Sequence, residues 1–242
     1  MPVIKFRGKI HSVLLKNTLQ RHSNRKHIRN TEKHHLVVLT KEGKKQAFEL
    51  GKKMQKKAKL KLYFSPSIRT RQTAFHLYQG FKQAGGKAAK YKHAKRKGVR
   101  KELLGGNMFP DNVYAQKELS KVGGSNSLMM RNWLDGKYPP EKIASPQKMA
   151  EDIIRKRFGL GQRAARAGVK GYQMLNITHD WQMMAVFERL TGKKFDKAGL
   201  RAPKPNEGII VYHTKEGKAI LEYQGKRFEV TRRLNQILKR NN

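Results

Sequence analysis

The chain has no cysteine, no long apolar run and few acidic residues. Without cysteine it can form neither disulfides nor thiolate metal sites. No apolar stretch approaches the roughly 18 residues that a membrane-spanning helix requires. The N-terminal segment MPVIKFRGKIHSVLLKN lacks the apolar core and small-residue cleavage site of a signal peptide. We therefore expect a cytoplasmic protein with no membrane span, and a cleaved organelle presequence is the alternative.

Acidic residues are outnumbered by basic ones throughout the chain. The sequence has 55 Lys and Arg residues against 17 Asp and Glu residues, which gives a formal net charge of +38. Such a charge attracts polyanions, so RNA, a ribosome, an anionic membrane surface or phosphorylated substrates are the expected partners. The competing explanation is a genome whose base composition favours lysine, because the lysines are spread over most of the chain.

The order of apolar and turn-forming segments predicts an α/β fold. Strand-like segments at 12–19, 61–65 and 171–180 alternate with segments that have helical spacing, a pattern typical of a mainly parallel sheet flanked by helices in three layers. Residues 208–230 predict two or three antiparallel strands, with turns at 215–217 and 224–225. Thr40 and Ser145 are placed to cap helices, and Ser65 is placed to cap a helix that opens at Pro66.

No linker or internal repeat divides the 242 residues, which are enough to form a substantial core. We expect a single domain, residues 1–242. An irregular cap insertion is expected at about 82–145, where turn residues are frequent, and a basic C-terminal tail at about 231–242. The Gly- and Ala-rich residues 82–101 are either a polyanion contact or a solvated loop.

Four pieces of sequence combine into a candidate site, each at a predicted strand end or helix start. In open α/β sheets, ligands bind beyond the carboxyl ends of the strands, so these pieces can converge there. They are RHSNR (21–25), SPSIRTRQTA (65–74), Glu102 and THD (178–180).

The residue types in these pieces suit phosphate chemistry. Arginine presents a planar fork of donors that matches phosphate oxygens, and its charge does not titrate away. Arg21, Arg25 and Arg69 could together hold a phosphoryl group. The like charges around His22 should lower the pKa of its imidazole, and a neutral imidazole is a competent nucleophile. A nearby carboxylic acid can protonate the leaving oxygen.

The ordered pieces resemble the histidine phosphatase superfamily, the phosphoglycerate mutase-like proteins. The family has an Arg-His-Gly turn after its first strand, where this chain has RHS. The stretch LTKEGKKQAFELG (39–51) is similar to the next family block, and SPSIRTRQTA (65–74) matches the S-P-x-x-R-x-x-Q-T-A block throughout. LNITHD (175–180) and PNEGIIVY (205–212) resemble its late strands.

The resemblance implies a role for each matching residue and a phosphoglycerate mutase-like fold. His22 would be the phosphohistidine nucleophile. Arg21 and Arg69 would bind the phosphoryl group, and His179 would donate to a phosphate oxygen. The remaining matches are Arg25, which corresponds to an extra arginine of the acid phosphatase branch, and two competing proton donors, Asp180 and Glu102. No metal or cofactor is expected, because the arginines supply the positive charge.

The sequence departs from the family at Ser23, where the family has glycine, and around Glu102, where the mutase pattern is poorly formed. We therefore expect a phosphomonoester hydrolase that acts on a phosphorylated small molecule. The alternatives are a catalytically weak or inactive member that binds RNA or the ribosome, and a phosphoglycerate-type mutase. The pair His34-His35 is not expected to bind a metal. The sequence leaves the substrate and the oligomeric state open.

Overall fold

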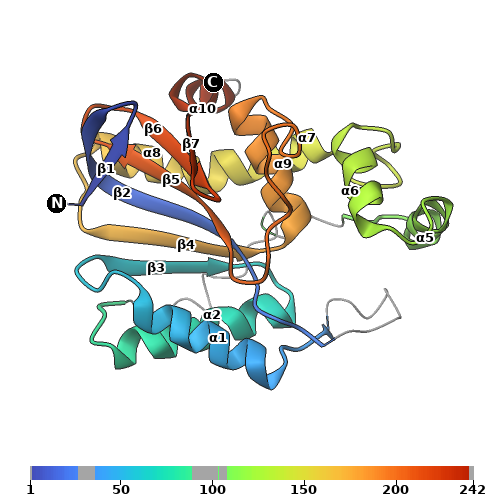
Figure 1. Cartoon of the computed structure of the whole chain (residues 1–242), viewed down its shortest axis with the longest axis horizontal. Coiled ribbons are helices and arrows are strands. Elements are labelled where there is room, and N and C mark those ends of the chain that lie inside the picture. Colours follow the sequence, from blue (N-terminus) through green and yellow to red (C-terminus); the bar gives the residue numbers. More distant parts are fainter. Residues whose placement is uncertain (1, 27–35, 89–102, 104–107, 240–242) are drawn as a thin grey trace.

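The computed structural model describes residues 2–26, 36–88, 103 and 108–239, and it contains a central sheet with helices on both faces (Figure 1). The strands are β1 (Val3–Phe6), β2 (Lys9–Arg21), β3 (Lys59–Phe64), β4 (Tyr172–Thr178), β5 (Gly208–Thr214), β6 (Ala219–Tyr223) and β7 (Lys226–Glu229). The helices are α1 (Lys41–Lys53), α2 (Ile68–Gln83), α5 (Asn112–Lys121), α6 (Asn126–Leu134), α7 (Pro146–Ile153), the π-helix η2 (Ile154–Phe158), α8 (Gly159–Arg166), α9 (Asp180–Thr191) and α10 (Thr231–Lys239).

The seven-stranded sheet has the order β3-β4-β2-β5-β6-β7, and β1 pairs with the start of β2. β3, β4 and β2 are parallel neighbours, whereas β5, β6 and β7 follow one another antiparallel. β4 is buried along nearly its whole length, as expected for a parallel strand that is covered on both faces. The predicted three-layer α/β fold is confirmed, and so are the antiparallel strands after residue 208.

One layer consists of α1 and α2, which pack on β3 and β4 (Figure 1). Two glycines let the helix backbones approach closely. A Cβ on Gly51 would overlap the carbonyl oxygen of Leu77, and a Cβ on Gly80 would overlap that of Phe48. Apolar side chains of α2, including Leu77 and Phe81, close a small core against β3 and β4. This packing fixes the N-terminal ends of both helices at one edge of the sheet.

The opposite layer contains α7, η2, α8, α9 and α10 and encloses the larger core. α9 supplies much of its buried surface, with Met183, Val186, Phe187 and Leu190 all fully buried. Trp133 of α6 is also buried, and its indole N–H donates to the carbonyl of Ala144 at 2.7 Å. The four residues of α9 recur at helical spacing, which turns one face of the helix toward the core.

Helix starts follow the predicted caps at two places and differ at a third. The hydroxyl of Thr40 accepts from the amide of Gly43 at 2.9 Å, and Ser145 precedes Pro146 at the start of α7. α2, in contrast, begins at Ile68 with Ser67 as its N-cap residue, so Ser65 is not the cap. The reason is that the Ser65 hydroxyl lies in a buried contact with another segment.

Two short helices, α5 and α6, occupy the stretch in which the cap is expected. Their starts are capped by the side chains of Asp111 and Ser125, which accept from the amides of Tyr114 and Leu128. The connection at 82–101 is described only as far as residue 88, and Glu102 and His34-His35 lie outside the described residues.

Candidate functional site

The candidate site lies where the parallel strands end. Arg21 is the last residue of β2 and is paired in register with Thr178, the last residue of β4. Phe64 ends β3 next to Ile177 of β4, so the chain then delivers Ser65 to the same edge. His179 and Asp180 begin α9. The parallel register therefore brings three distant segments of the sequence together.

The loop after β2 is held by its backbone. The amide of His22 donates to the carbonyl of Thr178 at 3.1 Å, and the amide of Ser23 donates to the hydroxyl of Thr73 at 3.0 Å. The hydroxyl of Ser23 is hydrogen-bonded to the side-chain oxygen of Asn206. Ser23 is fully buried. Ser23 thus ties the loop to the segment before β5.

His22 is buried, and its hydrogen bond determines which ring nitrogen carries the proton. Nδ1 lies 2.7 Å from the carbonyl oxygen of Ser23. A carbonyl oxygen can only accept, so Nδ1 is the protonated nitrogen and Nε2 of the neutral ring carries the lone pair. Burial, followed by the positive charge of Arg69, holds the pKa of His22 well below its usual value. The ring is therefore neutral at neutral pH, as the sequence predicts, although burial is the largest cause.

Three arginines surround the histidines. The Nη2 atom of Arg21 lies 3.0 Å from a carboxylate oxygen of Asp180, and its Nη1 donates to the carbonyl of Pro203 at 2.6 Å. Burial, and then the charge of Arg25, lowers the pKa of Arg69 to about 10. Burial also lowers the pKa of Arg25, against the influence of Asp180. Three guanidinium groups and one carboxylate leave an excess of two positive charges, which suits a dianionic ligand.

His179 is held between Arg69 and a buried group of hydroxyls. The Nη2 atom of Arg69 lies 3.1 Å from Nδ1 of His179. Since a guanidinium can only donate, Nδ1 accepts and Nε2 carries the proton of the neutral ring. Burial, followed by Arg69, holds the pKa of His179 well below its usual value. The rings of His22 and His179 meet edge to face, with centroids 5.3 Å apart.

The hydroxyl oxygen of Ser65 lies 3.2 Å from Nε2 of His179. Thr70 donates its hydroxyl proton to the carbonyls of Ser65 and Ser67, at 2.7 and 2.8 Å, because these oxygens cannot donate. The Thr70 oxygen therefore accepts from the Ser65 hydroxyl at 2.9 Å, which leaves the Ser65 oxygen to accept from His179. The chain of donors runs from His179 through Ser65 to Thr70.

Sequence reasoning missed these supporting residues. Ser65 and Thr70 are both fully buried, and Asn206 has a left-handed backbone with φ of 65°. A signal was available: the stretch SPSIRTRQTA carries four hydroxyl residues, more than helix capping requires. The structure brings together Arg21, His22, Arg25, Arg69, His179 and Asp180, whereas Glu102 lies outside the described residues.

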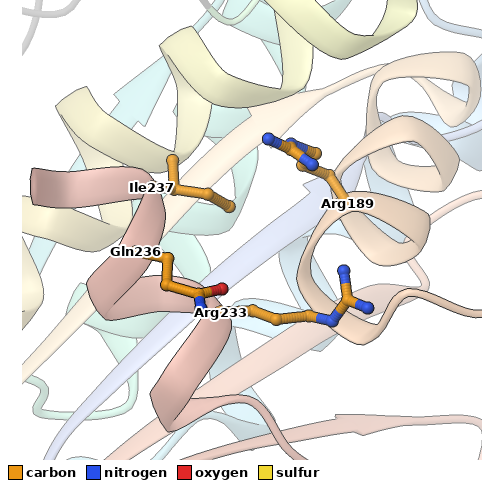
Figure 2. A pocket seen from close by; sticks show the side chains of 4 residues that line it. All are labelled: Arg189, Arg233, Gln236 and Ile237. Atoms are coloured by element: carbon orange, nitrogen blue, oxygen red, sulfur yellow. The ribbon is translucent and has the colours of Figure 1, made fainter. Parts of the chain in front are cut away.

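Other ligand-binding features are few in the described ranges. These residues include no group of three or more His, Asp or Glu side chains that could hold a metal ion. No described helix has the length and apolar character needed to cross a bilayer. A pocket of about 160 Å³ lies at the far end of α9 from Asp180, lined by Arg189, Arg233, Gln236 and Ile237 (Figure 2). Arg189 is paired with Glu151 there, so the charge of the pocket is partly neutralised.

This chain is similar to known proteins in its structure, whereas comparison of its sequence finds no match. No model of a known protein family matches the chain. No curated protein sequence matches it either.

Several solved structures share the arrangement of the elements. A phosphoglycerate mutase from Bacillus anthracis has a TM-score of 0.53 at 17% identity, and the match covers 94% of this chain and 98% of that one. A mycobacterial glucosyl-3-phosphoglycerate phosphatase has a TM-score of 0.57 at 15% identity, with coverage of 87% and 98%. A protein described as mycobacterial hydrolase 2 has a TM-score of 0.55 at 12% identity, with coverage of 94% and 98%. The chain therefore has the fold of the histidine phosphatase superfamily, the phosphoglycerate mutase-like proteins.

Proposed function

We propose that the protein is a phosphomonoester hydrolase that works through a phosphohistidine on His22. The observation that carries the proposal is the hydrogen bond from Nδ1 of His22 to the Ser23 carbonyl, at 2.7 Å. It leaves the Nε2 lone pair for attack, on a ring that burial and arginine charges keep neutral. The phosphatase and hydrolase among the structures of similar fold are consistent with this reaction class.

The arginines support binding of a phosphoryl dianion. Arg21, Arg25 and Arg69 carry three positive charges, enough to balance a phosphomonoester dianion whether Asp180 is ionised or holds the proton that it donates in the reaction. Nε of Arg21 is buried and has no hydrogen-bond partner among the described residues, so a donor is available to a phosphate oxygen. The same donors would stabilise charge on the equatorial oxygens in the transition state.

In the proposed first step, Nε2 of His22 forms a bond to phosphorus as the bond from phosphorus to the ester oxygen breaks. A carboxylic acid gives its proton to that oxygen, and the alcohol leaves. A water molecule then attacks the phosphohistidine and passes a proton to the carboxylate, which releases inorganic phosphate and restores His22. We assign the proton transfers to Asp180, whose carboxylate lies 3.0 Å from Arg21. Glu102 is the competing donor.

The test measures phosphate release from p-nitrophenyl phosphate and from an alkyl phosphate, in the presence of a chelator. Turnover by the unchanged protein, with at least 10³-fold loss in His22→Ala, supports the proposal. Alkali-stable, acid-labile phosphate on the denatured protein, absent from His22→Ala, identifies the intermediate. Equal rates in the two proteins would overturn the proposal.

A comparison of two variants identifies the proton donor. A general acid matters more for an alkyl phosphate, whose leaving group is a strong base, than for p-nitrophenyl phosphate. Asp180→Asn is expected to lose far more activity on the alkyl ester than on the aryl ester. Glu102→Gln is expected either to keep both activities or to lose both by the same factor. The reverse pattern would assign the proton to Glu102.

A further inference from the structure

A cluster of lysines lies at the edge of the sheet opposite the candidate site, where β3 and β4 begin. We call it the lysine edge, and each of its members is exposed. They are Lys53, Lys56, Lys57, Lys59, Lys61, Lys87 and Lys170.

Hydrogen bonds join the segments that carry these lysines. The amide of Lys59 donates to the carbonyl of Gly171 at 2.7 Å, which places Lys170 beside the start of β3. The amide of Leu60 donates to the carbonyl of Lys87 at 2.9 Å. The side chain of Gln173 donates to the carbonyls of Gln55 and Ala58, which ties the turn after α1 to β4. The ends of α1 and α2 and the starts of β3 and β4 therefore lie together on one surface.

The positive charge of the lysine edge is not balanced within the described part of the chain. Residues 50–88 and 153–179 contain no Asp or Glu. Glu49, the nearest acidic residue in the sequence, already pairs with Lys52 at 3.2 Å. None of the seven lysines forms an ion pair with a described carboxylate. Such a concentration of like charge costs stability unless a polyanion binds to it.

Structural roles account for only part of the cluster. Lys59 and Lys61 lie on an edge strand, where lysine discourages pairing with another sheet. Lys53 lies in the last turn of α1, where a cation interacts favourably with the helix dipole. Neither explanation covers Lys56, Lys57, Lys87 and Lys170, which come from three separate segments.

We propose that the lysine edge binds the phosphate backbone of double-stranded DNA without sequence preference. Lysines act as point charges toward phosphates and carry no base readout, and among them Gln55 alone has a side chain of the kind that reads base edges. The described large apolar side chains that are exposed all lie outside residues 50–61, 85–88 and 168–172. The one aromatic ring in these stretches, Tyr172, is half-buried and lies under the ammonium group of Lys61, 4.3 Å from the ring centroid, so it is not free to stack on a base. The edge therefore lacks the stacking platforms used for single strands and the apolar side chains that enter a membrane.

The composition of the edge also favours DNA over double-stranded RNA. RNA duplexes are recognised in part through contacts to the 2′-hydroxyl. In residues 52–61, 85–88 and 168–172 only two side chains other than lysine, Gln55 and Tyr172, have groups for such contacts, so the edge offers many more contacts to phosphates than to 2′-hydroxyls. The surface lies away from the candidate site, so DNA binding is independent of the proposed hydrolase activity.

The experiment measures fluorescence anisotropy of a labelled 25-base-pair DNA duplex between 50 and 200 mM salt. If six or seven phosphates are contacted, affinity should fall about 10³-fold over this range, with a logarithmic slope of about −5 to −6. The triple variant Lys56→Glu/Lys57→Glu/Lys170→Glu should bind about 10²-fold more weakly at 100 mM salt, and its slope should be smaller by about 3.

The matched control is Lys117→Glu/Lys148→Glu/Lys197→Glu, which changes the net charge equally at exposed positions on α5, on α7 and after α9. The DNA affinity of this control should be within about threefold of that of the unchanged protein. Both triple variants should have the phosphatase rate and the melting temperature of the unchanged protein. Equal weakening by the two triples would show that only net charge matters and would overturn the proposal. A slope near zero would also overturn it, as would tighter binding to an RNA duplex, a single strand or anionic vesicles.

Discussion

The imidazole of His179 donates from Nε2 to the hydroxyl oxygen of Ser65, 3.2 Å away. The direction of this hydrogen bond follows from neighbouring groups that can act only as donors or only as acceptors. Arg69 must donate to Nδ1, and the backbone carbonyls that receive the Thr70 proton must accept. The contacts at Nδ1 and at Nε2 thus favour the same neutral tautomer of His179, the one with its proton on Nε2. Ser65 acts as a positioning residue for this ring.

Ser65→Ala is expected to weaken the preference of His179 for the tautomer with its proton on Nε2. Without the Ser65 oxygen, Nε2–H loses its described acceptor and only Arg69 still favours this tautomer, so the other tautomer becomes partly populated and kcat falls roughly tenfold. Nitrogen-15 NMR of the imidazoles measures the tautomer directly. The control is Ser67→Ala, which removes a buried hydroxyl of the same cluster that contacts Ser65 and Thr70 but not His179. Unchanged His179 nitrogen shifts in Ser65→Ala would contradict the assignment.

Ser23→Gly introduces the glycine that the histidine phosphatases, which this sequence resembles, have after the histidine. The amide that donates to Thr73 is retained, so activity should stay within about threefold of the unchanged protein. The hydrogen bond to Asn206 is lost and the unfolded chain gains freedom, so unfolding should become easier by about 1–2 kcal/mol.

Denaturant titration and steady-state kinetics check the two effects of Ser23→Gly separately. Asn206→Gly removes the same hydrogen bond at a left-handed position, where φ is 65° and glycine is preferred, so it should cost less stability. A 100-fold loss of activity in Ser23→Gly would show that the serine itself takes part in the reaction.

Gly80→Ala tests the close approach of α1 and α2. Its Cβ would overlap the carbonyl oxygen of Phe48, and backbone cannot move away as a flexible side chain can. We expect a loss of about 1–3 kcal/mol in the free energy of unfolding, measured by urea titration. The control is Gly217→Ala, where φ is 76° and no atom lies within 4 Å of the added Cβ. It should show only backbone strain, about 1 kcal/mol. An equal or smaller loss in Gly80→Ala would contradict the predicted clash.

His213 should make the protein less stable in mild acid. Burial lowers its pKa to about 4, and Nε2 has no hydrogen-bond partner among the described residues. Between this pKa and the unfolded value of 6.5, the unfolded state binds more protons, so stability is lost as pH falls through that window. A shift of this size corresponds to about 3 kcal/mol.

The measurement for His213 is urea unfolding at a series of pH values from 7 to 4. His213→Gln cannot titrate, so its stability should decline less steeply than that of the unchanged protein. A residual decline is expected in the variant, because burial also lowers the pKa of His22 and His179. Identical pH dependence in the two proteins would rule out His213 as the source.

Much of the fold could be predicted from local patterns. Thr40 and Ser145 cap helices where the sequence predicts them, and the turns at 215–217 and 224–225 join antiparallel strands. These features depend on residues only a few positions apart. The expectation for Ser65 was wrong, because its partner, His179, is 114 positions away in the sequence. Local spacing contains no information about such a contact.

The sequence by itself determined that histidines and arginines would gather at one edge of the sheet. Each follows or begins a predicted element, and the carboxyl ends of parallel strands meet at the same edge. Only the tertiary structure decided the protonation of the two rings, the pairing of Arg21 with Asp180 and the meeting of the lysine-bearing segments at the opposite edge. The physical reason is that proton positions and charge balance depend on distances across the fold, which residue order along the chain does not specify.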